Sequence, residues 1–210
     1  SLLSRVAISW AGLQSDRLAT TSGPGLDIRI LPFRGEYYKL KGEATHLVKH
    51  LIYPVPDPAF PFLGVHFTRV VGGGVECGPN AVLSLAREQY QKLAIEPADA
   101  LDALAWPGLQ KLGQRYWQQA LMEVWRSWWK PAFVAALQRL VPAVTSADLE
   151  NGGAGIRAQA CDRQGQLVDD FVIVSDGPVL HVCNAPSPAA TASLGIGQDL
   201  ATLTLQHLES

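Results

Sequence analysis

The sequence lacks the features that would assign it to several broad classes. It has only three cysteines among 210 residues, Cys77, Cys161 and Cys183, and none belongs to a CxxC pair. An odd number of unclustered cysteines predicts reduced thiols, as in a cytosolic protein, and argues against a disulfide framework or a zinc site. The chain has no run of basic residues, and its formal net charge of −2 argues against nucleic acid as a partner.

Long hydrophobic runs and targeting signals are lacking as well. The longest apolar stretch, residues 131–144, is interrupted by Gln138 and Arg139. It is shorter than the roughly 20 residues that a membrane span needs. No secretory leader is visible. These absences predict a cytoplasmic protein, with peripheral contact to the inner membrane as the alternative, and the 48% of hydrophobic residues suffices for a core.

Residues 46–80 carry the clearest signal of a binding site. Residues 62–71 have the β-branched and aromatic content of a strand, and three glycines at 72–74 turn the chain into a returning strand at 75–77. Side chains alternate between the two faces of a strand. One face of the first strand carries a small residue, a titratable ring and a hydroxyl: Gly64, His66 and Thr68. The other face carries Val65 and Phe67, so the first face is predicted to be a pocket wall.

Two histidines nearby have a plainer interpretation. His46 and His50 stand four residues apart, as metal ligands on a helix can. Pro54 ends any such helix, and no carboxylate or third histidine follows within it at matching helical spacing. We therefore predict no metal site.

A tryptophan-rich helix is expected at residues 109–130. Its apolar stripe follows helical spacing and consists of Trp117, Leu121, Trp125 and Trp128. This stripe favours a helical layer packed against the sheet over a platform for stacking a ring. Contact of exposed members with a partner subunit or a membrane surface is the alternative.

The other elements expected from periodicity and turn residues mix strands with helices. They are strands at 6–10, 28–31, 37–40, 156–160, 171–174 and 180–183, helices at 13–18, 81–90, 96–105, 131–140 and 187–208, and turns at 32–36, 151–155 and 162–165.

Six sequence blocks carry a resemblance that spans nearly the whole chain. In order they are PFRGEYYKL (32–40), HLIYPVPDPAFPFLGVHFTR (50–69), GPNAVL (78–83), GIRAQA (155–160), LVDDF (167–171) and HVCNAPSPAATASLGIG (181–197). They resemble the L-2-hydroxyglutarate oxidase/dehydrogenase family, FAD enzymes of the D-amino-acid-oxidase-like superfamily. The family opens with a strand–GxGxxG–helix unit for the ADP half of FAD, and this sequence contains no GxGxxG. The chain therefore resembles the second half of the family's length.

The resemblance implies an α/β fold of α+β character. A largely antiparallel sheet backed by helices would form the substrate-binding domain, at residues 26–153. Residues 1–25 and 154–210 would belong to a FAD-binding domain that lacks its GxGxxG unit.

The resemblance also implies the residues of the site. His66 is the candidate base, and Tyr53, His66 and Arg157 would bind substrate, because a guanidinium matches a carboxylate bidentately. The cofactor would be FAD. Its candidate contacts are Ala11, Gly12, Asn184, Pro186, Ser187, Pro188, Ala189, Ala190 and Thr191. A helix expected to start at Ser187 and Pro188 would stabilise negative charge on reduced flavin.

By resemblance, the reaction is oxidation of a small dicarboxylate 2-hydroxy acid, L-2-hydroxyglutarate, to 2-oxoglutarate by hydride transfer to flavin. An N-terminal FAD-binding half would be a further partner, and the electron acceptor is left open between oxygen and a quinone. Two alternatives stay open: an amino- or imino-acid flavin oxidase of the same superfamily, and a non-enzymatic substrate-domain fragment.

Overall fold

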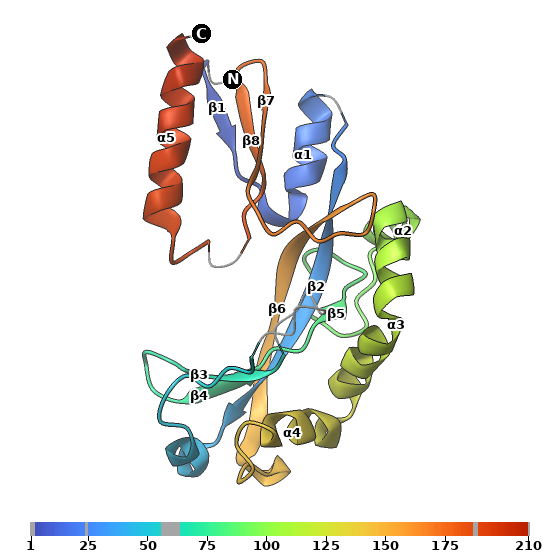
Figure 1. Cartoon of the computed structure of the whole chain (residues 1–210), viewed down its shortest axis with the longest axis vertical. Coiled ribbons are helices and arrows are strands. Elements are labelled where there is room, and N and C mark those ends of the chain that lie inside the picture. The colour runs from blue at the N-terminus through green and yellow to red at the C-terminus, as the bar shows by residue number, and fades with distance from the viewer. Residues whose placement is uncertain (1–2, 24, 56–63, 187–188, 210) are drawn as a thin grey trace.

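The computed structural model describes residues 3–23, 25–55, 64–186 and 189–209. In chain order its elements are β1 (Ala7–Ser9), α1 (Ser15–Ser22), β2 (Ile28–Leu40), β3 (His66–Arg69), β4 (Val75–Gly78), β5 (Val82–Leu83), α2 (Pro97–Ala105), α3 (Pro107–Trp128), α4 (Lys130–Gln138), β6 (Leu149–Asp162), β7 (Val172–Asp176), β8 (Val179–Asn184) and α5 (Ser193–Glu209). They form two sheets with helices around them (Figure 1). The expected mixed fold, with a largely antiparallel sheet backed by helices, is confirmed.

The smaller sheet joins the two ends of the chain. Its strand order is β1-β8-β7. β1 runs parallel to β8, with Ile8 opposite Leu180, and β7 returns antiparallel to β8. In Figure 1, α1 and α5 lie to opposite sides of this sheet. The strands at both ends of the sequence therefore combine into one sheet.

The larger sheet is built around the long strand β2. β6 pairs antiparallel with it from Ile28↔Asp162 to Leu40↔Leu149, while β4 and β5 pair with its other side. The expected flexible turn at 151–155 is wrong, because these residues belong to β6. Gly152 packs so closely on β2 that an added Cβ would lie 2.9 Å from the Tyr37 carbonyl oxygen. The proposed domain boundary between residues 153 and 154 falls within β6, and the division into domains stays a prediction.

The expected turn at 32–36 is also wrong, because β2 continues through Pro32 and Gly35. Glycine is needed at position 35 for close approach: an added Cβ would lie 2.5 Å from the Pro79 Cβ. Gly35, which the sequence suggests as a turn residue, thus allows close packing of a loop 44 positions later in the chain.

The hairpin expected after residue 62 is confirmed in its described part. β3 pairs antiparallel with β4, with Thr68 opposite Glu76. Val65 and Phe67 are buried in the core, whereas His66 and Thr68 are half-buried on the other face. The alternation therefore places His66 on the face predicted to line a pocket.

Residues 81–90 do not form the expected helix. They contain β5 and a series of bends. Arg87 is almost fully buried and donates to the Asp16 and Asp102 carboxylates, at 2.5 and 2.9 Å. Buried ion pairs and the short β5 ladder thus outweigh the helix propensity of this segment.

The tryptophan stripe of α3 is exposed, contrary to the packed layer that we favoured. Trp117, Leu121, Trp125 and Trp128 are each at least half exposed to solvent. α3 is kinked at Tyr116 (φ −120°, ψ 25°) and buries a different set of residues, Gly108, Leu112, Glu123 and Ser127. In the part of the chain that the structure describes, no helix is long and apolar enough to cross a membrane.

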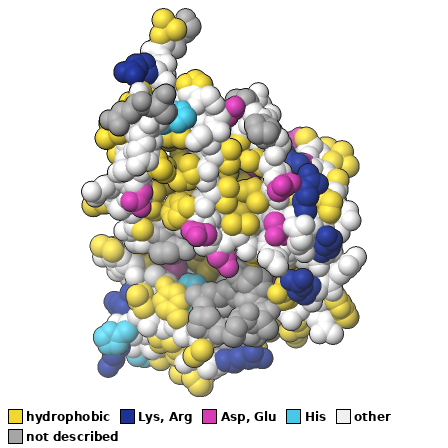
Figure 2. Space-filling model, turned by 45° about the horizontal axis from the view of Figure 1, so that its top comes forward, with side chains coloured by type: hydrophobic (Ala, Val, Ile, Leu, Met, Phe, Trp, Pro, Cys, Tyr) yellow, Lys and Arg dark blue, Asp and Glu magenta, His cyan; other side chains and the backbone are white. Residues whose placement is uncertain are grey.

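The smaller sheet and its helices also expose apolar side chains. Ile8 and Trp10 on and after β1 are nearly half exposed, and Leu194 in α5 is 90% exposed. Figure 2 shows hydrophobic side chains gathered in the middle of one face of the molecule, with acidic side chains at their border.

Candidate functional site

One cavity brings the predicted substrate-binding residues together. It measures about 460 Å³ and lies among β2, β3, β6 and the loop after β4. Its lining residues are Phe33, Gly35, Tyr37, Tyr53, His66, Pro79, Asn80, Ala81, Gly155, Ile156 and Arg157. Tyr53, His66 and Arg157, which are far apart in the sequence, all line this cavity. Their chemical roles stay predictions.

Two contacts orient the His66 ring within the cavity. Its ring stacks on the Tyr53 ring, with centroids 4.2 Å apart and planes inclined by 21°. Nδ1 lies 3.1 Å from the Gly64 carbonyl oxygen, which can only accept, so this hydrogen bond places the proton on Nδ1. Burial lowers the pKa of His66, and the Gly64 hydrogen bond opposes that shift. Nε2 of the neutral ring is thus available to accept a proton.

Arg157 supplies a cation at the rim of the same cavity. It lies on β6 opposite Phe33 of β2, and its side chain is partly exposed to solvent. Partial burial lowers the pKa of Arg157, and the Asp169 carboxylate opposes the shift. A guanidinium stays protonated near neutral pH even so. The cavity therefore pairs a neutral histidine with a permanent positive charge.

Tyr37 is a lining residue that we did not predict. Burial, then the charge of Glu76 and then Tyr53 raise its pKa, so the phenol keeps its proton and remains a donor. Alternation along β2 could have identified Tyr37 as a lining residue, because Phe33, Gly35 and Tyr37 share one face of the strand and all line the cavity. The interpretation of residues 32–36 as a turn hid that pattern.

Asn80 is the second residue that we missed. Its side-chain oxygen accepts the Glu36 backbone N–H at 2.7 Å, and its Nδ2 donates to the Glu36 carboxylate at 3.3 Å. The same buried carboxylate receives Arg34 at 3.1 Å, Ser127 at 2.9 Å and Lys92 at 3.3 Å. Asn80 therefore helps to fix the loop of Pro79, which lines the cavity, against β2.

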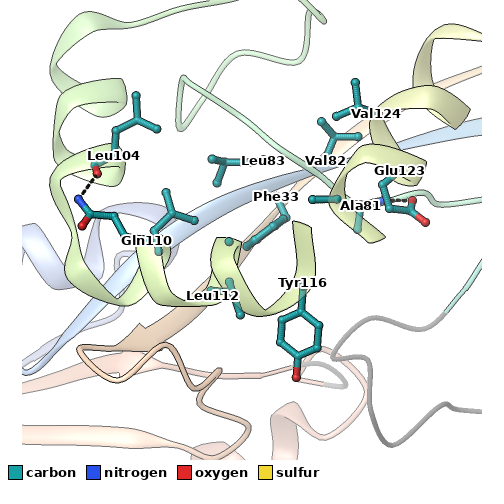
Figure 3. A pocket seen from close by; sticks show the side chains of 13 residues that line it. Phe33, Ala81, Val82, Leu83, Leu104, Gln110, Leu112, Tyr116, Glu123 and Val124 are labelled. Atoms are coloured by element: carbon teal, nitrogen blue, oxygen red, sulfur yellow. Dashed lines mark hydrogen bonds between the residues drawn. The ribbon is translucent and has the colours of Figure 1, made fainter. Parts of the chain in front are cut away.

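A second, apolar cavity of about 390 Å³ lies between α2, α3 and β5 (Figure 3). It shares Phe33 and Ala81 with the first cavity, and its other lining side chains are nearly all hydrophobic. Among its polar groups, Glu123 already accepts the Ala81 N–H at 3.0 Å, and the Gln110 amide donates to the Leu104 carbonyl. This cavity has little to offer a charged acid, so the polar cavity is the candidate active site.

The segments predicted to contact a flavin meet at one edge of the smaller sheet. Ala11 and Gly12 follow β1, and Asn184 ends β8, the parallel neighbour of β1. The carboxyl ends of adjacent parallel strands form the crevice in which α/β sheets bind nucleotides. Gly12 has φ +53° and no atom within 4 Å of an added Cβ, so a flat group can approach its backbone. The open backbone at this edge fits the isoalloxazine part of FAD.

Three details of the flavin prediction change. α5 begins at Ser193, and Ala189, Ala190 and Thr191 lie in a turn before it, so the expected helix start at residue 187 is wrong. Ser187 and Pro188 lie outside the described residues. The Asn184 amide donates to the carbonyls of Val168 and Asp170 at 3.0 and 2.7 Å, which commits its donors to the preceding loop. Pro186 is half-buried beside these residues.

A buried ionic network fixes this edge to the rest of the molecule. Arg87 donates to the Leu13 carbonyl, next to Gly12, and to Asp16 at the start of α1. Asp16 also accepts the Ile30 N–H of β2 at 2.9 Å. The turn after β1 is therefore held against β2, the strand that carries part of the cavity wall.

Comparison with known proteins identifies the family of this chain. Residues 5–203 match the family described as FAD dependent oxidoreductase. The chain is 54% identical over 198 residues to an L-2-hydroxyglutarate dehydrogenase of Indibacter alkaliphilus, covering 94% of this chain and 50% of that protein. It is 45% identical to the mitochondrial L-2-hydroxyglutarate dehydrogenase of Homo sapiens, covering 96% of this chain and 45% of that protein.

The fold also matches a solved structure. Dithionite-reduced L-alpha-glycerophosphate oxidase from Mycoplasma pneumoniae with FAD bound superposes with a TM-score of 0.60 at 18% identity, covering 97% of this chain and 42% of that one. The chain spans about half the length of the curated relatives it matches. Because residues 5–203, nearly its whole length, match the family, this chain belongs to the FAD dependent oxidoreductase family.

Proposed function

We propose that this chain forms the substrate site of a FAD-dependent enzyme that oxidises L-2-hydroxyglutarate to 2-oxoglutarate. The observation that carries the proposal is the pairing of a neutral, oriented His66 with the Arg157 cation in one cavity. The high identity to L-2-hydroxyglutarate dehydrogenases supports the choice of substrate.

The roles follow from the chemistry of each group. Nε2 of His66 accepts the proton of the substrate hydroxyl, which requires the neutral ring that partial burial favours. Arg157 binds the carboxylate next to that hydroxyl through its planar fork. The Tyr37 and Tyr53 hydroxyls supply donors for the second carboxylate. A dicarboxylate is thereby held at both ends, with its hydroxyl directed to the base.

FAD, when bound, would accept the hydride from the carbon that carries the hydroxyl. Ala11, Gly12 and the turn at residues 189–191 would hold it through backbone groups. This sequence contains no GxGxxG unit for the nucleotide part of FAD. We propose that polypeptide corresponding to the remaining length of the relatives contributes this unit. The electron acceptor stays open between oxygen and a quinone. The cytoplasmic location and a peripheral membrane contact stay predictions.

Substrate-dependent bleaching of flavin absorbance under anaerobic conditions tests the proposal. In the complete enzyme, in which this chain is combined with the polypeptide that supplies the nucleotide-binding unit, L-2-hydroxyglutarate should reduce the bound FAD, whereas glycine, sarcosine and proline should leave it oxidised. Reduction by the amino or imino acids alone would instead support oxidation of a C–N bond and overturn the proposed reaction.

A further inference from the structure

β6 has an open edge beside the substrate cavity. β2 pairs with one side of β6 along its whole length. In the part of the chain that the structure describes, no further strand is paired with its other side. Residues 166–168 cover only the end of that side, where Cys161 bridges Leu167. The stretch before it, residues 154–158, is the open edge.

The hydrogen-bond pattern identifies the backbone groups that point outward. In a strand, the N–H and C=O of one residue point to the same side and alternate between successive residues. The Val168 N–H donates to the Ala160 carbonyl, and the Asp162 N–H donates to the Gln166 carbonyl. The backbone N–H and C=O groups of the even-numbered residues in this part of β6 therefore point away from β2. The outward groups of the open edge belong to Ala154, Ile156 and Ala158.

The strand β2 confirms this parity independently. Its even-numbered residues point away from β6, because the Pro32 carbonyl accepts the Ser84 N–H and the Ile30 N–H donates to Asp16. Residues directly opposite in the register share parity, as in Arg34↔Ile156 and Gly35↔Gly155. The backbone groups of the odd-numbered residues Gly155 and Arg157 thus form hydrogen bonds with β2. Those of their even-numbered neighbours point to the open side.

This edge lacks the usual protection against strand addition. Proteins guard exposed edges with lysine, proline or bulges. Here the edge carries Ala154, Gly155, Ile156 and Ala158, and its one charged residue, Arg157, lines the cavity. The register is regular from Ile28↔Asp162 to Tyr37↔Gly153, so no bulge interrupts residues 154–158. Gly155 and Ile156 line the same cavity, so whatever covers the edge also borders the substrate site.

We propose that an extended segment of polypeptide pairs with β6 at residues 154–158 and closes this side of the substrate cavity. The segment would come from the length of the relatives that this chain does not match, which is half of the Indibacter alkaliphilus protein. Strand addition supplies affinity through main-chain hydrogen bonds and needs only an accessible edge of this kind. The proposal depends on family membership and not on the identity of the substrate.

Amide hydrogen exchange, resolved by residue, tests the proposal in this chain and in an intact relative. In the 210-residue chain, the amides of Ala154, Ile156 and Ala158 should exchange about 100-fold or more faster than those of Gly155, Arg157 and Gln159. In the intact Indibacter alkaliphilus relative, both sets of amides in the matching strand should be slow. Outward amides that remain fast in the intact relative would overturn the proposal.

Proline substitutions give a second, independent readout. Proline is tolerated in an edge strand where its missing N–H would face solvent. Ala158→Pro should leave the urea midpoint of this chain near that of the unchanged protein, whereas Gly155→Pro should lower it. Equal losses would show that the edge is already covered in this chain and would contradict the proposal. Slow outward amides that appear only as the chain dimerises would assign the edge to a second copy, and would also overturn it.

Discussion

The His66 ring stacks on the Tyr53 ring at 4.2 Å, while the Nδ1 atom of His66 is bonded to the Gly64 carbonyl. Stacking fixes the plane of the imidazole, and the hydrogen bond fixes its tautomer. Together they fix the direction in which Nε2 points. The proposed base is therefore oriented by a neighbour 13 positions earlier in the chain and by its own strand.

Arg157→Lys should weaken substrate binding while FAD stays bound. Lysine keeps the positive charge but loses the fork that binds a carboxylate bidentately. Losing that geometry costs about 1.5–3 kcal/mol, or roughly tenfold to a hundredfold in apparent affinity. Titration of the complete FAD-containing enzyme with 2-oxoglutarate, followed by the flavin spectrum, measures the change. Unchanged affinity would remove Arg157 from the substrate site.

Tyr37→Phe should change specificity more than rate. If the Tyr37 hydroxyl binds the second carboxylate, its loss should raise the KM for 2-hydroxyglutarate about fivefold to tenfold, as expected for one hydrogen bond of ~1 kcal/mol. The KM for a monocarboxylate such as 2-hydroxybutyrate should stay the same. Equal effects on both substrates would show that Tyr37 does not contact the second carboxylate.

Gly35→Ala should destabilise the fold, with Gly155→Ala as the matched control. The two glycines face each other across β2 and β6 and line the same cavity. An added Cβ at Gly35 would lie 2.5 Å from the Pro79 Cβ, whereas one at Gly155 would meet no atom within 4 Å. Urea unfolding should show a loss of about 1–3 kcal/mol for Gly35→Ala, typical of an overpacked position. A loss of similar size for Gly155→Ala would show that the Pro79 contact is not the cause.

The 210-residue chain alone should bind FAD weakly or not at all. The sequence contains no GxGxxG loop to cradle the pyrophosphate. Gel filtration with excess FAD should leave little flavin with the chain, whereas the intact Indibacter alkaliphilus relative should serve as the positive control. Stoichiometric, tightly held FAD on this chain would contradict the prediction.

Local pattern predicted those parts of the fold in which neighbouring residues decide the structure. The β3–β4 hairpin follows from alternation and the glycine turn, and its buried Val65 and Phe67 occupy the expected face. Gly35 misled because its role depends on Pro79, a contact that no local window contains. The same holds for Arg87, whose ion pairs to Asp16 and Asp102 replace a helix that the local composition favours.

Side-chain spacing alone could not decide which face of a helix is buried. The Trp117 to Trp128 stripe has core-like spacing, yet α3 turns Leu112 and Glu123 inward and leaves the tryptophans exposed. For the site, strand alternation indicated His66 as a pocket residue, while the resemblance supplied Arg157 and the role of each; no local pattern connects the two. Tyr37 was within reach of the alternation rule once β2 is known to be continuous.

The central claim is that the neutral ring of His66 takes the substrate proton. Burial lowers the pKa of His66, so the base is already deprotonated at neutral pH. Flavin reduction should therefore be fast and independent of pH above neutrality. It should slow only as the pH falls below the ordinary range of histidine, where the ring gains a proton.

Stopped-flow flavin reduction at saturating L-2-hydroxyglutarate, measured across pH for the complete FAD-containing enzyme and its His66→Gln variant, tests this claim most directly. The variant should bind substrate nearly as well, reduce flavin about 10²–10⁴ times more slowly and lose the acid limb of the profile. An unchanged reduction rate, or an acid limb that persists in His66→Gln, would contradict the assignment of His66 as the base.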